Sequence, residues 1–207
     1  MGELGTSSVC NFKFYTGIPC LDFLVTLRGR REERLETLQS FAALVSWCRM
    51  AGIAGAHDTQ SLVRVSGADG RAYVRTAIAL REALYRIFSA ATSGQPVPLE
   101  AVTSLNRVLR RGPAYCRVDL GNDGQLTKRM VATAGPWHLL LAIAQSAVDL
   151  LTGRDAALIH ACANPRCSVI FVDRSKNRSR RWCSMSLCGN LMKVTRFHQR
   201  VRAKLAR

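Results

Sequence analysis

Four of the eight cysteines are spaced like the ligands of a metal ion. Four residues separate Cys162 from Cys167 and Cys183 from Cys188, and fifteen residues lie between the two pairs. Each short loop presents two thiolates from one side, which suits a tetrahedral ion, and soft sulfur ligands favour zinc over magnesium or calcium. Four thiolates also leave no coordination position for a catalytic water. The spacing therefore predicts one structural Zn²⁺ bound by these four residues.

Other uses of these cysteines stay open on sequence alone. They are an iron–sulfur cluster, a redox pair of disulfides, a redox-sensitive version of the zinc site, or four unrelated thiols. His160 and His198 are near enough in sequence to substitute as ligands, but each is more typical of a surface or packed histidine. The remaining cysteines are scattered among apolar residues, as expected for small buried hydrophobes in a cytosolic chain: Cys10, Cys20, Cys48 and Cys116.

The positive charge of the chain is concentrated around the same four cysteines. The 207 residues include 30 Lys and Arg and 14 Asp and Glu, a formal charge of +16. Residues 160–207 contain twelve basic residues and one acid, Asp173. This asymmetry indicates a polyanionic partner, most often nucleic acid and secondarily an anionic membrane surface, with a solvated tail as the alternative.

A β-hairpin is predicted to carry the first group of cations. Residues 168–172 are β-branched and aromatic and suit a strand, residues 173–179 suit a turn, and residues 180–183 suit a return strand. Trp182 is expected to pack beneath the metal site rather than to stack on a base. Five cations on the tip and return strand are predicted to contact phosphates: Arg174, Lys176, Arg178, Arg180 and Arg181.

A C-terminal helix is predicted to carry the second group. Ser184 or Ser186 can cap it, and no proline follows. An apolar stripe at steps of four and three is predicted to dock on the protein: Leu187, Leu191, Val194, His198, Val201 and Leu205. The opposite side forms a cationic ridge ending at Arg207, with a solvated helix face as the alternative. Its predicted base or phosphate contacts are Lys193, Arg196, Arg200 and Lys204.

The first 159 residues are typical of a mostly helical α+β domain. Apolar stripes predict helices around 38–48, 77–91, 102–109 and 137–151, and a strand is predicted within 12–21. Residues 115–120 and 125–131 flank a Gly/Asn/Asp turn and predict a hairpin. No phosphate loop or nucleophile–base signature occurs, so no enzymatic activity is expected, and Asp22, His57 and His138 are interpreted as structural. A small-molecule pocket is expected between the helices and this hairpin.

These motifs resemble a known family. Residues 162–167, 171–173, 178–185 and 188–190 resemble the CGNR zinc finger, and segments between Cys20 and Asn106 resemble the ABATE domain that precedes it in bacterial stress-induced transcription regulators. The resemblance implies DNA binding by the finger. It also implies the same zinc ligands, Cys162, Cys167, Cys183 and Cys188. Leu191 stands where the family has its name-giving arginine, and Val25 where an asparagine is usual.

Together these observations predict an α+β fold in two parts. A mostly helical domain with a β-hairpin is expected over residues 1–153, and a small four-cysteine zinc finger of hairpin plus C-terminal helix over 154–207. The predicted function is a zinc-dependent, DNA-binding transcription regulator. An RNA-binding zinc module and a thiol redox sensor using the same cysteines are the alternatives.

Partners and location follow from the same observations. Double-stranded DNA is the expected partner of the finger, and the N-terminal domain could bind a small-molecule effector or form a homodimer. The first residues show no basic-then-apolar signal pattern, and no apolar run approaches the roughly 18 residues of a membrane helix. We therefore expect a cytoplasmic, nucleoid-associated protein with no membrane partner.

Overall fold

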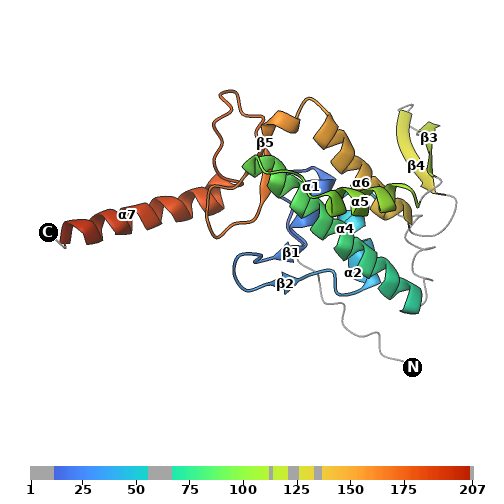
Figure 1. Ribbon diagram of the computed structural model, residues 1–207, viewed down its shortest axis with the longest axis horizontal. Helices are drawn as coiled ribbons and strands as arrows, with labels where there is room; N and C mark the ends of the chain where they lie inside the picture. Colours follow the sequence, from blue (N-terminus) through green and yellow to red (C-terminus); the bar gives the residue numbers. More distant parts are fainter. Residues whose placement is uncertain (1–11, 56–66, 112–113, 121–125, 133–136, 206–207) are drawn as a thin grey trace.

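The computed structural model describes residues 12–55, 67–111, 114–120, 126–132 and 137–205 (Figure 1). Side chains are described neither between 112 and 136 nor after 202. Within the described residues, five helices form the body: α1 (Pro19–Leu24), α2 (Phe41–Met50), α4 (Gly67–Ser93), α5 (Leu99–Leu109) and α6 (Trp137–Thr152). The α+β fold class expected from the sequence is confirmed.

The long helix α4 lies at the centre of the body and buries one broad, mostly apolar face. It contacts α1, α2, α5 and α6. Leu80, Leu84 and Phe88 recur at the helical spacing and are at most 1% exposed. Pro98 directly precedes α5, and this helix was predicted around residues 102–109. Within the described residues, no helix has both the length and the apolar character needed to cross a bilayer.

The strand expected within residues 12–21 is wrong, because the chain there forms a loop followed by α1. Pro19 occupies the first turn of α1, where its fixed φ angle favours a helix. The buried carboxylate of Asp22 then accepts the N–H groups of Tyr15, Thr16 and Gly17 at 2.8–3.0 Å. These bonds satisfy the loop backbone in place of a neighbouring strand, and they confirm the structural interpretation of Asp22.

Two antiparallel strand pairs belong to the N-terminal part. β3 (Ala114–Leu120) pairs with β4 (Leu126–Ala132), which confirms the predicted hairpin, although its turn lies outside the described residues. β1 (Leu27–Arg28) pairs with β2 (Leu35–Glu36) and was not anticipated. Arg81 of α4 is 1% exposed and holds this pair through Glu36 at 2.6 Å and Thr26 at 3.1 Å.

A third strand pair joins the C-terminal part to the body. After the short helix η1 (Ala156–Leu158), β5 (Ile159–Ala161) pairs antiparallel with β6 (Ile170–Val172). Ile159, Ile170 and Val172 belong to the same core cluster as the body helices. The predicted return strand over residues 180–183 is wrong, since β5 is the partner of β6 and this segment forms no strand.

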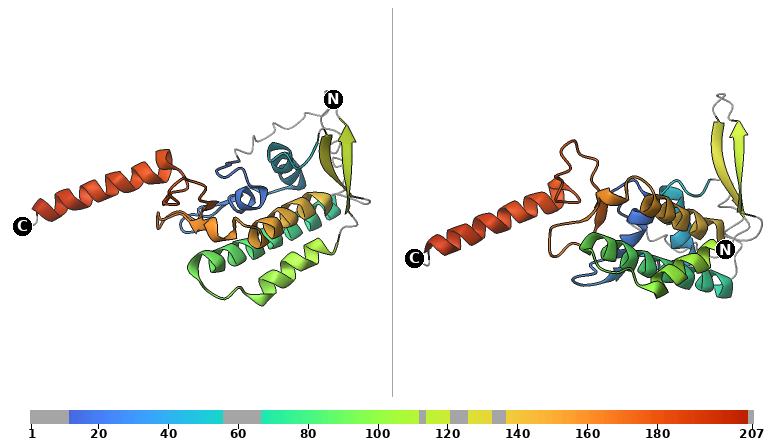
Figure 2. Two further views of the ribbon diagram at one scale, coloured as in Figure 1. Left: turned by 90° about the horizontal axis from the view of Figure 1, so that it is seen from above. Right: turned by 45° about the horizontal axis from the view of Figure 1, so that its top comes forward.

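The last helix, α7 (Asn190–Leu205), extends away from the body, as Figures 1 and 2 show. Its predicted apolar stripe is not docked: Leu191 is 49% exposed and Val194 is 53% exposed. The prediction that this stripe packs on the protein is therefore wrong. The reason is the direction of the helix, which leaves the cysteine cluster through η2 (Met185–Gly189) and points outward.

Candidate metal centre and nucleic-acid interface

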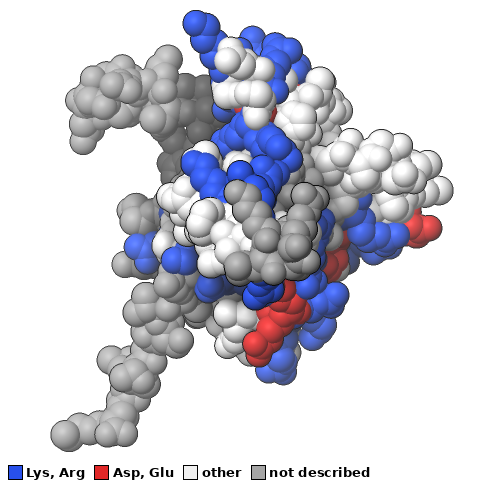
Figure 3. Space-filling view, turned by 90° about the vertical axis from the view of Figure 1, so that its left-hand side faces the viewer, with Lys and Arg blue, Asp and Glu red and all other residues white. Residues whose placement is uncertain are grey.

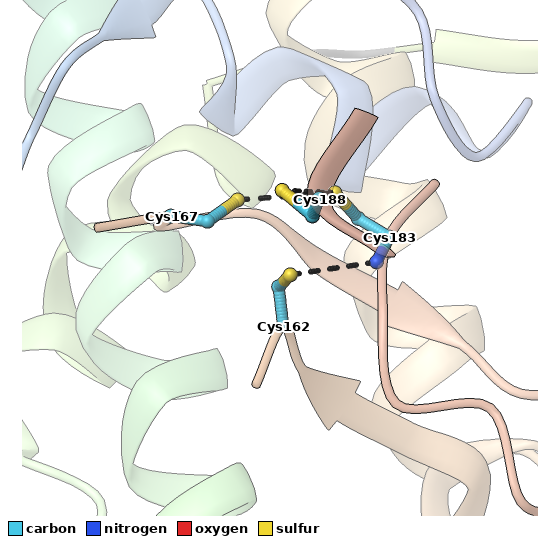
Figure 4. A group of neighbouring side chains, drawn as sticks. All are labelled: Cys162, Cys167, Cys183 and Cys188. Atoms are coloured by element: carbon cyan, nitrogen blue, oxygen red, sulfur yellow. Dashed lines mark hydrogen bonds between the residues drawn. The ribbon is translucent and has the colours of Figure 1, made fainter. Parts of the chain in front are cut away.

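The structure brings the sulfur atoms of Cys162, Cys167, Cys183 and Cys188 within 4.8 Å of one another (Figure 4). The Sγ atom of Cys183 lies 3.8 Å from that of Cys167 and 3.7 Å from that of Cys188. A tetrahedral zinc ion with Zn–S bonds of about 2.3 Å needs sulfur atoms about 3.8 Å apart. The cluster therefore has the dimensions of a metal site with four thiolate ligands.

Two short segments position the four thiols. Cys162 follows β5 and Cys167 precedes β6, so the first pair lies in the turn between these strands. The N–H of Cys162 donates to the carbonyl of Val169 at 2.9 Å, which closes this turn. Cys183 and Cys188 are at the two ends of a capped turn, in which the Ser184 hydroxyl accepts the N–H of Leu187 at 3.3 Å. The predicted cap at Ser184 is confirmed.

Three N–H groups point at the sulfur atoms and would stabilise thiolates there. The backbone N–H groups of Cys183 and Val169 lie 3.5 Å from the Sγ atoms of Cys162 and Cys167. The side-chain amide of Asn164 donates to Cys188 at 3.4 Å. Asn164 is 4% exposed, and the sequence pattern assigned it no role. Its place between two ligand cysteines is the signal that could have identified it.

The thiols also affect one another's acidity. Hydrogen bonds from Cys167 and Cys183 lower the pKa of Cys162, and contacts with Cys162 and Cys167 raise the pKa of Cys183. A bound cation would stabilise the thiolate form of its ligands. Among the described residues, the group with metal-ligand geometry contains these cysteines and neither His160 nor His198.

The cations after β6 lie on a loop, residues 174–181, which we call the basic loop. Its base is Asp173, which is 0% exposed and accepts the N–H of Ser175 at 2.9 Å and the N–H of Arg180 at 2.8 Å. The Ser175 side chain and these two N–H groups together hold the pKa of Asp173 below its usual value. Between them the chain turns at Arg178, whose φ angle is +47°. The single acid of the C-terminal segment therefore shapes the loop that carries the cations.

The five predicted phosphate contacts of the basic loop have different surroundings. Arg174 forms an ion pair with Asp155 at 2.7 Å. The Arg180 guanidinium lies 4.5 Å above the ring of Phe171 and donates to the carbonyls of Trp182 and Cys183, so it also supports the second cysteine pair. Arg181 lies over Trp182, which is half-buried in the cluster around the cysteines, as expected.

Lys176 and Arg178 are exposed, and neither is ion-paired to a described residue. The ridge cations Lys193, Arg196 and Arg200 on α7 are likewise exposed. Lys204 belongs to α7, but its side chain lies outside the described residues. On the face toward which α7 points, Lys and Arg predominate over Asp and Glu (Figure 3). Contact of these cations with nucleic acid stays a prediction.

The N-terminal part contacts the first cysteine pair directly. Arg31, from the loop between β1 and β2, donates to the carbonyl of Pro165 at 3.1 Å. In the same loop Glu32 forms an ion pair with Arg166. Neither contact was predicted, because no local pattern links residues that are 134 positions apart.

The other residues singled out in the sequence do not join the site. Cys20 and Cys48 are fully buried in the body, as predicted, and burial raises the pKa of each thiol to about 12. Cys10 and His57 lie outside the described residues, as does the side chain of Cys116. The pocket expected beside the β3–β4 hairpin also falls there, since its side chains are not described.

Comparison with known proteins finds two family models that match the chain. Residues 17–154 match the ABATE family model, which is described as "Putative stress-induced transcription regulator". Residues 159–201 match the model of the CGNR zinc finger. A search of curated proteins found no match to the chain.

Proposed function

Since the chain belongs to the ABATE family and carries a CGNR zinc finger, we propose that it is a zinc-dependent transcription regulator that binds double-stranded DNA. The basic loop and the ridge of α7 would form the contact surface. Zinc would have a structural role, with one ion held by the four cysteines. The ABATE part would sense a signal and pass it to the finger.

The observation that carries this proposal is the pairing of a metal-sized thiol cluster with cations that have no acidic partner in the described structure. The cluster organises two cation-bearing elements, because Cys183 and Cys188 lie between the basic loop and α7. Exposed cations on one surface repel one another, and an anionic partner relieves this repulsion. The phosphate backbone supplies that charge at regular spacing.

The basic loop and α7 would contact different parts of the duplex. Lys176, Arg178 and Arg181 are exposed and suited to phosphates, which position a protein on the duplex. The α7 helix is long enough to follow a groove, and its ridge bears Lys193, Arg196 and Arg200. Leu191 replaces the arginine expected from the family motif, so the ridge cations are the nearest candidates for base contacts. When bound, zinc cross-links the two cysteine pairs and fixes these elements relative to each other.

The direct test is binding of the zinc-loaded chain to a labelled random-sequence duplex, followed by fluorescence anisotropy at several salt concentrations. If about six phosphates are neutralised, the logarithm of the affinity should fall with a slope of about −5 against the logarithm of salt concentration. An affinity that does not change with salt would contradict the electrostatic basis of the proposal. Structured RNA as competitor at equal salt decides between DNA and RNA.

A pair of cysteine variants tests the role of zinc. Cys183→Ser should lose the bound zinc and bind the duplex at least tenfold more weakly, because the basic loop and α7 lose their common anchor. Cys48→Ser is the matched control: this thiol is buried in the body, away from the cluster, so zinc content should stay at one per chain. Normal DNA affinity of Cys183→Ser would show that the zinc finger is not the element that binds DNA.

A further inference from the structure

A groove lies where the body meets the basic loop. It consists of two adjoining hollows of about 500 and 310 Å³ that share Ile18 and Arg174 as lining residues. The larger runs along the end of α6, and the smaller is bounded by the Thr16–Ile18 segment, the end of β6 and the basic loop. These volumes are in the range of small-molecule sites. The four cysteines of the cluster, all of them described residues, line neither hollow.

The two ends of the groove differ in charge. The smaller hollow is lined by two guanidinium groups, Arg174 and Arg180, and by the hydroxyl residues Thr16 and Ser175, with no carboxylate among its lining residues. The larger hollow has two acids, Asp149 and Asp155, which are balanced by Arg154 and the shared Arg174. An anionic group is therefore favoured most at the end next to the basic loop, where no carboxylate lines the hollow.

The groove also offers apolar surface next to its cationic end. Ile18 lines both hollows, Ala142 and Leu150 line the larger one, and Val172 lines the smaller one. A free phosphate or acetate ion would leave this surface in contact with water. An organic anion with a compact hydrocarbon body would cover it and gain from the burial of apolar area. The chemistry that fits is a small amphipathic carboxylate.

Both walls of the smaller hollow are already ordered. Asp22 holds the backbone of Tyr15, Thr16 and Gly17 on one side. Asp173 holds Ser175 and Arg180 on the other. A ligand entering here loses little free energy in ordering its site, which favours binding.

Arg174 connects this groove to the DNA-binding surface. Its side chain is 65% exposed and forms an ion pair with Asp155. Exposed ion pairs of this kind contribute little to stability, so another anion can replace Asp155 as the partner of Arg174. A carboxylate in the smaller hollow and a DNA phosphate would both need this guanidinium. Binding of one must then weaken binding of the other, and the coupling is reciprocal.

We propose that this groove binds a small amphipathic carboxylate whose charged group contacts Arg174, and that the bound ligand lowers the affinity of the finger for DNA. The regulatory half rests on the proposed function. The binding half depends only on the groove, so the two can be tested separately.

The experiment uses the zinc-loaded full chain labelled with ¹⁵N. Salicylate and hexanoate are the organic probes, acetate is the anion without a hydrocarbon body, and salicyl alcohol is the uncharged analogue, all at constant ionic strength. Salicylate and hexanoate should shift the amide signals of Ile18 and Ser175 saturably, at least fivefold more tightly than acetate, and salicyl alcohol should not. At saturation they should raise the Kd for the duplex at least threefold.

Two arginine variants control for charge. Arg174→Ala should lose saturable probe binding and should no longer respond to the probes in the DNA assay. Arg178→Ala removes the same charge from the same loop but lines neither hollow, so it should bind the probes as the parent chain does. Zinc content and circular dichroism verify that both variants are folded.

Three outcomes overturn the inference. The groove is not a carboxylate site if neither organic probe gives saturable shifts at Ile18 and Ser175, or if Arg178→Ala weakens the probes as much as Arg174→Ala does. The regulatory half fails if the probes bind in the groove while the Kd for DNA stays constant. A chain that binds the probes but no duplex would instead refute the proposed function and leave the binding site standing.

Discussion

At the scale of single residues, Asp173 determines the form of the basic loop. Its buried carboxylate accepts N–H groups from both ends of the loop, and its own N–H donates to the carbonyl of Leu158 at 2.8 Å. It thus ties the loop to the hairpin that carries the first cysteine pair. A carboxylate in a cationic surface is usually expected to oppose DNA binding, but here it arranges the cations for which we propose DNA contact.

Because of this role, we expect substitution of two aspartates to change DNA affinity in different directions. Asp173→Asn removes one negative charge, yet we expect DNA affinity to fall about threefold to tenfold, since the amide cannot accept both N–H groups and one end of the loop loses its anchor. Asp155→Asn removes the same charge but only releases Arg174, so affinity should stay equal or rise. Anisotropy at one salt concentration measures both. Stronger binding by both variants would show that charge alone matters.

At the scale of elements, the two faces of α7 differ in what they contact. Its cationic ridge has a proposed partner in DNA, whereas its apolar stripe is exposed in the described structure. Exposed apolar residues on a helix that extends from the body add little to the stability of the chain, because folding buries little of their area. The stripe therefore affects the fold much less than its periodicity suggests.

A matched pair of leucine substitutions tests this exposure. Leu191→Ala should change the free energy of unfolding by less than about 0.5 kcal/mol, as is usual for surface positions. Leu80→Ala, in the core of α4, should cost about 2–5 kcal/mol. Denaturant unfolding followed by circular dichroism gives both values. A cost of several kcal/mol at Leu191 would mean that the stripe docks on the protein in solution.

The contact between α4 and the β1–β2 pair predicts a pH dependence. Burial alone would raise the pKa of Glu36, but hydrogen bonds from Arg81 and the Leu38 N–H outweigh it, so the pKa is lowered from 4.5. The ionised group therefore stabilises the fold above about pH 4.5, and this contribution is lost as the pH falls through the lower folded-state pKa. Glu36→Gln lacks it at every pH. Stability curves of the two proteins should converge below about pH 4.5, and parallel curves would exclude this linkage.

At the scale of the whole molecule, the finger and the body share one hydrophobic core. Ile159, Ile170 and Val172 come from the finger hairpin but pack with the body helices. The β1–β2 loop reaches the first cysteine pair through Arg31 and Glu32. The metal site is thus built on the body, so we expect the loss of one to affect the stability of the other.

Removal of zinc should therefore affect the entire chain. Treatment with a chelator should lower the Tm of one cooperative transition by roughly 5–15 °C, since each kcal/mol corresponds to about 2–4 °C for a protein of this size. Scanning calorimetry with and without chelator measures the shift, and Cys183→Ser should show no further shift. Two separate transitions, the upper one insensitive to chelator, would show that finger and body unfold independently.

The sequence by itself determined the features that depend on local spacing. The two cysteine pairs, the Ser184 cap, the β3–β4 hairpin and the helices α2, α4, α5 and α6 involve residues a few positions apart, so chain geometry nearly dictates them. The family membership also rested on such motifs and was confirmed. The domain boundary near residue 153 and the nucleic-acid contacts stay predictions.

Tertiary structure alone decided which elements meet. The sequence predicted residues 180–183 as the partner strand of 168–172, whereas residues 159–161 pair with 170–172, and Ile159 of this pair is buried in the body core. The same burial orients the cysteine cluster so that α7 leaves the body, although its apolar stripe predicted docking. Local spacing specifies a ligand set or a helix face. What that face contacts depends on apolar surfaces contributed by residues far away in the chain, which no local pattern records.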